Sequence, residues 1–228
     1  MDYREVAPPP ALAGLVKTRW TLAANGGPGD WIEQQATPDG CVELIRRTHG
    51  RSRWDTDQPA SFVVGLVDRP QVFAISGDAR FEALRLWPWA WTMLGGAPLA
   101  TLTGRWQPCP APDFDAIARR LAAAPALNAV GLAIVAAPTV AAMGSATGLS
   151  PRALQRWFAA HVGMPPRAYL RLLRFQKAFE TLPGETSLAG HAADGGFADQ
   201  AHMAREFRDL AGVPAGQARR RARGPFLR

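Results

Sequence analysis

The chain has 228 residues, of which 47% are hydrophobic and 20% charged, a composition typical of a soluble globular protein. Its longest apolar stretch, residues 126–142, is interrupted by polar, glycine and proline residues and falls short of the roughly 20 residues that span a bilayer. The N-terminus has no apolar signal core, and the two cysteines, Cys41 and Cys109, make neither a disulfide framework nor a zinc site. We therefore expect a cytoplasmic protein with no membrane partner, no cofactor and no metal.

The net charge of +7 is unevenly distributed along the chain. Residues 1–130 carry 13 basic and 13 acidic side chains, whereas residues 131–228 carry 13 basic and only 6 acidic ones. The whole positive excess therefore lies in the C-terminal part. A basic region joined to a neutral one is typical of a polyanion-binding module with a separate partner domain, although charge alone fits a merely basic surface equally well.

The first part of the chain is predicted to be β-rich. Four short apolar or alternating runs end at turn-forming residues: 41–45, 61–65, 71–76 and 81–87. Asp39-Gly40, in front of the first run, is a strong hairpin turn signal. Strands this short, with turns every ten or so residues, predict a small antiparallel barrel or sandwich over residues 1–108.

The pattern becomes helical after residue 108. A proline-rich spacer, 108–112, precedes a helix that Asp113 can cap and that runs to about residue 124, and a second apolar helix covers about 126–136. We place a helix-containing linker at 109–129 and an all-α domain at 130–228. The expected fold class is therefore α+β with two domains.

Two segments of this helical region, 49 positions apart, repeat one pattern. Each has a capping residue, two inward apolar residues, an outward arginine and a Gly-x-Pro stop. The matching residues are Ser150 and Asp199, Leu154 and Met203, Arg156 and Arg205, Phe158 and Phe207, Gly163 and Gly212, and Pro165 and Pro214. A shorter helix and a glycine turn precede each copy, so we predict helix-turn-helix units at about 139–162 and 187–211.

The first unit has the more polar outer face. Arg152, Gln155 and Arg156 project away from its apolar stripe, and arginine and glutamine can make bidentate contacts with guanine and adenine. The second unit presents Gln200, Ala201 and Arg205, with fewer polar groups. We therefore expect weaker base readout from the second unit, partly through phosphate contacts and DNA shape.

A helix at about 166–182, roughly 25 Å long, is predicted to connect the units and could hold them about one DNA turn, roughly 34 Å, apart. Arg171, Arg174 and Lys177 line one side of it. These basic side chains either contact phosphate or form a solvated face.

Residues 139–218 resemble the DNA-binding domain of the AraC/XylS family of bacterial transcriptional regulators. The matching motifs are 148–150, 154–158, 163–165, 174–178, 196–197, 199–202, 205–207 and 212–214. The resemblance implies a non-enzymatic regulator that binds double-stranded DNA, with RNA polymerase as a further expected partner. It also implies that DNA is contacted by Arg152, Gln155, Arg156, Gln200, Ala201 and Arg205.

The chain departs from the family pattern in the first helix of each unit, where a large aliphatic residue followed by alanine is usual. Met143-Gly144 and His191-Ala192 occupy these positions. Gly144 weakens its helix by up to about 1 kcal/mol relative to alanine. His191 is either a core histidine, a surface residue or, as a distant third, a pH sensor.

Residues 1–110 resemble, more weakly, the N-terminal sensory domains of one AraC-type subgroup, through the segments 38–45, 62–65 and 81–88. This resemblance implies a compact, cupin-like effector domain. A metal-dependent cupin enzyme is not expected, because His49 is the single histidine in residues 1–130.

Four residues are candidates for an effector site. Trp87, Trp89 and Trp91 alternate and would share one face of a strand, either as the wall of a pocket or as core and interface packing, although Pro88 disfavours a regular strand. Glu43 either faces solvent from a half-buried strand or acts as a polar anchor inside a pocket.

The sequence therefore predicts a DNA-binding transcriptional regulator modulated by a small-molecule effector. One alternative is a ligand-independent regulator whose first domain only forms a homodimer. Another is a DNA-repair fusion that uses a reactive cysteine, which we disfavour because neither Cys41 nor Cys109 has a neighbouring histidine or second cysteine.

Overall fold

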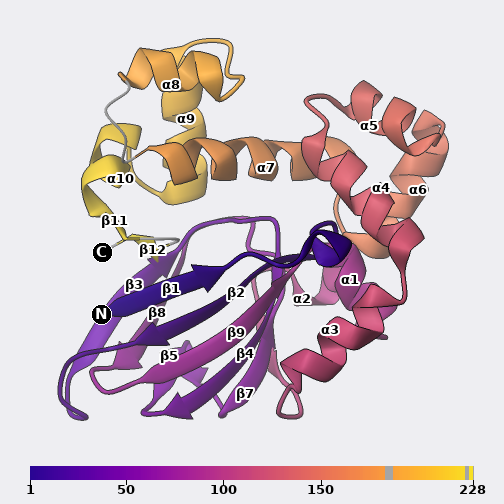
Figure 1. Ribbon diagram of the computed structural model, residues 1–228. Helices are drawn as coiled ribbons and strands as arrows, with labels where there is room; N and C mark the ends of the chain where they lie inside the picture. The colour runs from indigo at the N-terminus through magenta and orange to yellow at the C-terminus, as the bar shows by residue number, and fades with distance from the viewer. Residues whose placement is uncertain (183–186, 224–225, 228) are drawn as a thin grey trace.

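The computed structural model describes residues 1–182, 187–223 and 226–227. A β-rich N-terminal region lies beside a helical C-terminal region, so the expected α+β class is confirmed (Figure 1). The described strands form two sheets, and within each sheet all neighbouring described strands pair in antiparallel fashion.

The first sheet has its strands in the order β1 (Asp2–Val6), β2 (Val16–Ala23), β9 (Arg80–Leu86), β4 (Val42–His49), β7 (Ser61–Val64) and β10 (Trp106–Pro108). The second has the order β11 (Ala222–Arg223), β12 (Phe226–Leu227), β3 (Trp31–Ala36), β8 (Gln71–Ser76), β5 (Ser52–Trp54) and β6 (Thr56–Asp57). Buried side chains of both sheets, among them Trp20, Phe62 and Ile75, share one core. The sheets therefore pack as a sandwich and do not close into a barrel.

The turn at Asp39-Gly40 does not form the expected hairpin. The strand before it, β3, pairs with β8 in the second sheet, whereas β4 after it pairs with β7 and β9 in the first. The turn therefore carries the chain from one sheet to the other. Gly40 is required there, because its φ is +71° and a Cβ would lie 3.3 Å from the Tyr169 ring.

The runs predicted at 41–45, 61–65, 71–76 and 81–87 correspond to β4, β7, β8 and β9. Strands β1 to β3 were not predicted, although Val16, Thr18, Trp20 and Leu22 alternate inward along β2. No strand runs through the tryptophans, as Pro88 indicates, because residues after Trp87 form helix α1 (Pro88–Met93). Pro88 occupies the first helical position, where its missing N–H costs nothing.

The remaining helices are η1 (Pro10–Leu12), α2 (Leu99–Leu102), α3 (Phe114–Ala122), α4 (Pro125–Ala136), α5 (Val140–Thr147), α6 (Pro151–His161), α7 (Pro166–Thr181), α8 (Leu188–Asp194), α9 (Gln200–Ala211) and α10 (Ala215–Arg221). Side-chain oxygens accept backbone N–H groups at the start of five of them, from the caps Asp113, Thr139, Ser150, Ser187 and Asp199. Each such cap stabilises its helix by about 1 kcal/mol, and all five are where the sequence predicts helix starts.

One continuous apolar core joins the helical region to the sandwich. Trp89 of α1 is fully buried, and its ring centroid lies 5.7 Å from that of Trp157 on α6 and 6.1 Å from that of Tyr169 on α7. Helix α3, within the predicted linker, contributes Phe114 and Leu121 to this core. The predicted linker is therefore packed against both regions.

The end of the chain returns to the sandwich. Strand β12 pairs with β3 in the second sheet (Figure 1). The Gln35 side chain on β3 donates to the Ala211 carbonyl at the end of α9 at 2.6 Å. The last helices are thus attached to the second sheet, whereas α6 and the first turns of α7 rest on α1.

Within the described ranges, no single helix is long and apolar enough to cross a membrane. Helices α3 and α4 reach that length and composition only as a pair, which is bent by 94°.

Candidate nucleic-acid interface and sandwich cavity

The first helix-turn-helix unit consists of α5, a turn at Gly148 with φ +68°, and α6. Leu154 and Phe158 of α6 are buried, as their spacing predicts. The predicted contact residues Arg152, Gln155 and Arg156 are exposed together on the opposite side of the helix. Packing of α6 on the sandwich therefore leaves its polar face accessible.

The second unit consists of α8, the Gly195-Gly196 turn and α9. Its buried stripe is formed by Met203, Phe207 and Leu210. The three candidates on its outer face, Gln200, Ala201 and Arg205, are exposed. Both units thus have the predicted arrangement, and the 16-residue helix α7, about 24 Å long, spans the space between them (Figure 1).

Most arginines near these faces have no acidic partner. In the described part of the chain, no carboxylate lies within ion-pair distance of Arg152, Arg156, Arg167, Arg174 or Arg205. Arg171 is the contrast, because it binds Glu206 at 2.7 Å and Asp209 at 2.8 Å and so fastens α7 to α9. Of the three basic residues expected along α7, Arg171 is therefore neutralised within the protein.

Of the two departures from the AraC pattern, Gly144 has a local packing explanation and His191 is a core residue. A Cβ at Gly144 would lie 3.0 Å from the Leu149 carbonyl oxygen, so glycine lets the turn pack closely on α5. His191 is 4% exposed, which places it in the core. Its Nε2 has no hydrogen-bond partner among the described residues.

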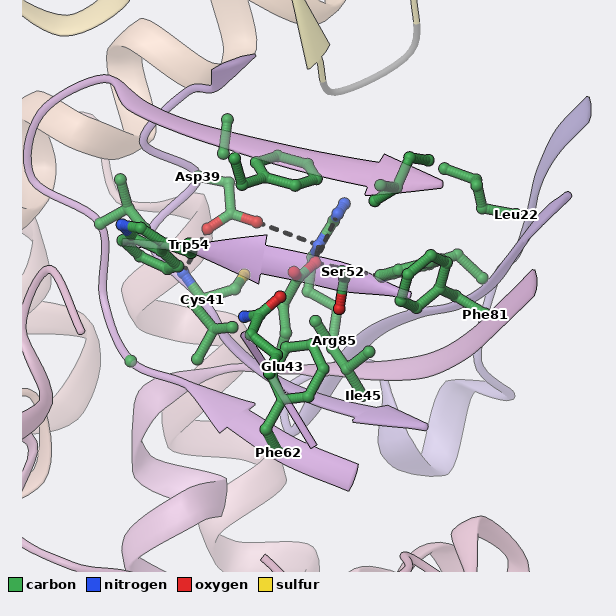
Figure 2. A pocket seen from close by; sticks show the side chains of 18 of the residues that line it. Leu22, Asp39, Cys41, Glu43, Ile45, Ser52, Trp54, Phe62, Phe81 and Arg85 are labelled. Atoms are coloured by element: carbon green, nitrogen blue, oxygen red, sulfur yellow. Dashed lines mark hydrogen bonds and ion pairs between the residues drawn. The ribbon is translucent and has the colours of Figure 1, made fainter. Parts of the chain in front are cut away.

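A cavity of about 80 Å³ lies between the two sheets (Figure 2). Its walls are mainly aromatic and aliphatic, with a charged group at one end. The lining includes Trp20, Leu22, Ile45, Trp54, Phe62, Phe73, Ile75 and Phe81, together with Asp39, Cys41, Glu43, Ser52 and Arg85. Of the four sequence candidates for an effector site, Glu43 is in this lining.

The three tryptophan candidates lie elsewhere. Trp87, Trp89 and Trp91 are all buried, and their indole N–H groups donate to backbone carbonyls at 3.0, 2.6 and 2.9 Å. The acceptors belong to Ala13, Gly14 and Ala97. The tryptophans therefore pack the core and the contact between the two regions, which is the alternative that the sequence left open.

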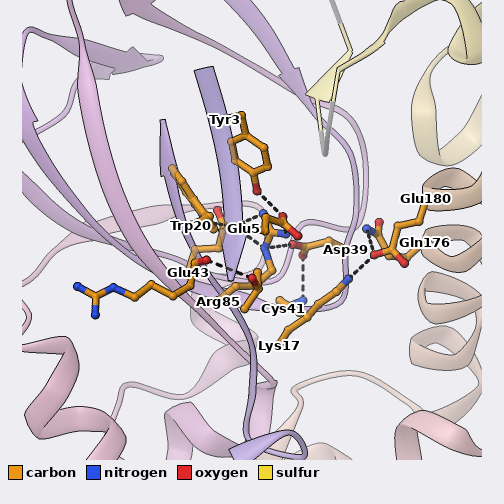
Figure 3. A network of polar contacts seen from close by, with 12 residues as sticks. Tyr3, Glu5, Lys17, Trp20, Asp39, Cys41, Glu43, Arg85, Gln176 and Glu180 are labelled. Atoms are coloured by element: carbon orange, nitrogen blue, oxygen red, sulfur yellow. Dashed lines mark hydrogen bonds and ion pairs between the residues drawn. The ribbon is translucent and has the colours of Figure 1, made fainter. Parts of the chain in front are cut away.

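The charged end of the cavity is centred on Arg85, whose side chain is 3% exposed (Figure 3). In the described structure three carboxylates contact its guanidinium group. Glu43 Oε1 accepts from Nε at 2.7 Å and lies 2.6 Å from Nη2, Asp39 Oδ2 lies 3.0 Å from Nε, and Glu5 Oε1 accepts from Nη1 at 3.1 Å. A buried guanidinium requires such partners, because leaving it unpaired in a low-dielectric interior costs several kcal/mol.

This cluster shifts the ionisation of its members. Burial raises the pKa of Glu43 against the opposing charge of Arg85. Burial would lower the pKa of Arg85, but the charges of Glu43 and Asp39 hold that pKa well above its ordinary value. Glu43 therefore resists ionisation in spite of its neighbouring guanidinium group.

Arg85 and Asp39 were not predicted as site residues, although the pattern of β9 contains a signal for Arg85. Phe81, Ala83 and Arg85 alternate on one face of the strand, so an arginine follows two inward apolar residues. Cys41, Glu43 and Ile45 alternate in the same way and all line the cavity. The Asp39 contact depends on the change of sheet at Gly40, which no local pattern predicts.

The cavity is linked to α7 through the loop that supplies Asp39. The Tyr169 hydroxyl on α7 donates to the Gly40 carbonyl at 2.9 Å. Lys17 on β2 reaches Glu180 at the other end of α7 at 2.9 Å. The helix that connects the two helix-turn-helix units therefore contacts the sandwich beside the charged end of the cavity (Figure 3).

Two protein-family models match the chain. Residues 143–221 match a helix-turn-helix domain, and residues 4–107 match a domain of unknown function (DUF6597). A search of curated proteins finds no match.

Solved structures of ToxT from Vibrio cholerae match most of the chain at low sequence identity. One apo ToxT structure is 10% identical, with 88% of this chain and 96% of that chain covered and a TM-score of 0.44. A ToxT structure bound to an unsaturated fatty acid is 10% identical, with 86% and 91% covered and a TM-score of 0.43. The family model places a helix-turn-helix domain at residues 143–221, in agreement with the resemblance of this part of the chain to AraC-type DNA-binding domains, and a β-rich region precedes it.

Proposed function

We propose that this protein is a sequence-specific transcriptional regulator that inserts α6 and α9 into successive major-groove segments of double-stranded DNA. The observation that carries the proposal is the exposed face of each helix, where arginines have no acidic partner among the described residues. Unpaired cations on a capped, exposed helix can neutralise phosphates or bind base edges. The positive excess of residues 131–228 favours the same polyanion.

The two helices have unequal roles in this proposal. Arg152, Gln155 and Arg156 contact bases, because arginine and glutamine match the major-groove edges of guanine and adenine. Gln200, Ala201 and Arg205 contribute less base readout and more phosphate contact. Arg167 and Arg174, which also lack an acidic partner in the described structure, are available to phosphate.

The domain assignment follows from these roles. Residues 1–108 would form the effector-sensing or dimerisation domain, 109–129 the packed linker and 130–228 the DNA-binding domain. An effector in the sandwich cavity would act on α7 through the Asp39-Gly40 turn, which touches both the cavity and Tyr169. Such coupling requires the effector to favour one arrangement of the turn over another.

The test is selection of bound duplexes from a random pool by the full chain. A shared motif should emerge, and a variant with Arg152, Gln155 and Arg156 all replaced by alanine should lose it. Arg69→Ala, at an exposed arginine on the sandwich, is the matched control and should keep the motif. If the triple variant enriches the same motif, α6 is not the base-reading helix. If the unmodified protein enriches no motif, sequence-specific binding is excluded.

A second candidate is a ligand-independent regulator whose N-terminal domain only forms a homodimer. The cavity volume favours it, because about 80 Å³ is well below the roughly 300–1,000 Å³ of sites for drug-sized ligands. Light scattering with and without ligand separates the two candidates. A stable dimer with no ligand response would favour the second, and contact with RNA polymerase can be tested by the same method.

A further inference from the structure

The charges at the end of the sandwich cavity do not balance. Among the described residues, Arg85 faces Asp39, Glu43 and Glu5, so three carboxylates share one guanidinium group. Glu5 is 40% exposed and is screened by water, but the other two are largely buried. Lys17 does not correct the excess, because Glu180 pairs with it. At least one negative charge is therefore uncompensated when Glu43 and Asp39 are both ionised.

One oxygen of Glu43 is unused. Its Oε1 accepts from Arg85 Nε and from Trp20 Nε1, the latter at 3.1 Å, and forms an ion pair with Arg85 Nη2. No donor in the described part of the chain reaches Oε2. The Glu43 side chain is 17% exposed and lines the cavity, so this acceptor is accessible to an occupant. A carboxylate in a largely apolar cavity favours a charged donor there.

The rest of the cavity suits an apolar body. Trp20, Trp54, Phe62 and Phe81 contribute aromatic surface to the lining. Figure 2 shows the last three in the same cavity wall as Glu43. Aromatic faces attract organic cations, because the ring quadrupole presents negative charge. Within the described ranges, no group of three His, Cys, Asp or Glu is arranged to hold a metal ion. The aromatic lining therefore favours an organic cation.

We propose that the sandwich cavity binds a small organic ammonium ion with an apolar body no larger than about one ring, its charged nitrogen against Glu43 Oε2. This assignment rests on the proposed role of the N-terminal domain as an effector domain and names the class of effector. An anionic ligand is disfavoured, because every donor nitrogen of Arg85 already contacts a carboxylate and Glu43 would repel it.

The ionisation of Glu43 supports the proposal. Burial raises its pKa, and the facing groups are Arg85 on β9, Asp39 in the preceding turn and the Trp20 N–H on β2, with Glu5 on β1 beyond Arg85. An ammonium ion prefers the ionised carboxylate. Its affinity should therefore increase as the pH rises through the raised pKa of Glu43, as long as the ligand remains protonated.

The experiment compares three one-ring probes of different charge: benzylamine, benzyl alcohol and benzoate. Isothermal titration calorimetry of the full chain at neutral pH should show benzylamine binding about 10- to 100-fold more tightly than benzyl alcohol, as expected for a charge-assisted hydrogen bond. Benzoate should bind more weakly than the alcohol. Stronger binding of benzoate, equal binding of amine and alcohol, or no binding of the amine would overturn the proposal.

Two variants locate the site. Glu43→Gln should reduce benzylamine affinity to that of benzyl alcohol, and it should fold, because Asp39 and Glu5 still neutralise Arg85. Glu33→Gln makes the same change at an exposed position of β3 and should leave the affinity unchanged. If Glu43→Gln does not fold, the pH dependence of benzylamine affinity in the unmodified protein tests the assignment instead. A benzylamine affinity that does not rise with pH contradicts the assignment.

The ligand class and the proposed function fail in different measurements. Benzylamine that binds in the cavity without changing DNA affinity would support the ligand class and contradict effector control. If DNA affinity responds to another ligand and benzylamine does not bind, effector control is supported and the ligand class is contradicted.

Discussion

The two regions of this protein use arginine in opposite ways. In the sandwich, Arg85 is 3% exposed and three carboxylates contact it among the described residues. In the helical region, Arg156 is exposed and has no acidic partner in the described structure. A buried guanidinium must be paired because removing it from water costs several kcal/mol, whereas an exposed one keeps its charge available to a polyanion. The surroundings of each arginine therefore indicate whether it holds the fold or binds a partner.

The largest expected effect is on the buried side of this comparison. Arg85→Met should lower the free energy of unfolding by about 3–5 kcal/mol, because Glu43 and Asp39 would remain buried without their cation. Urea denaturation measures this loss. Arg80→Met, at the exposed start of the same strand, is the control and should change stability by less than about 0.5 kcal/mol. Equal stability of the two variants would show that burial does not distinguish these arginines.

The next effect concerns the exposed arginines and distinguishes the two helix-turn-helix units. Arg156→Ala should cost about 1–3 kcal/mol of affinity for the selected duplex and much less for a scrambled one, because a base contact is lost. Arg205→Ala should weaken binding to both duplexes by a similar factor. It should also reduce the salt dependence of the binding constant by the amount expected for about one phosphate contact. Fluorescence anisotropy at several salt concentrations measures both. The reverse pattern would assign base readout to the second unit.

The smallest effect lies at the contact between the two regions. Glu180→Gln should lower the free energy of unfolding by less than about 1 kcal/mol, because the ion pair between Glu180 and Lys17 is partly exposed to water. Although burial opposes it, the Lys17 charge lowers the pKa of Glu180 below 4.5 in the folded protein. The stabilisation is therefore present above pH 4.5 and is lost as the pH falls through the lowered pKa. The free energies of unfolding of the unmodified protein and Glu180→Gln, measured from pH 7 down to pH 3, should converge. A difference that stays constant with pH would rule out the Lys17–Glu180 ion pair as the cause of the stability loss.

The helical region could be predicted in detail because its signals are local. Ser150, Ser187 and Asp199 accept N–H groups from residues three positions later, and Gly148 takes the left-handed conformation inside a short turn. Such interactions act within one helical turn, so the sequence spacing specifies them. Prediction of the sandwich was less complete, since the Asp39-Gly40 turn leads into a different sheet and helix α1 was not predicted.

By itself, the sequence determined the paired helix-turn-helix units, their exposed polar faces and the positive charge of that half, because helix periodicity and capping depend on neighbours in the chain. Only the tertiary structure decided that Trp89 joins the two regions and that Glu43 and Arg85 meet inside a cavity. Strand pairing brings together residues 42 positions apart in the case of Glu43 and Arg85. Pairing partners are chosen by the packing of whole sheets, and no short stretch of sequence carries that information.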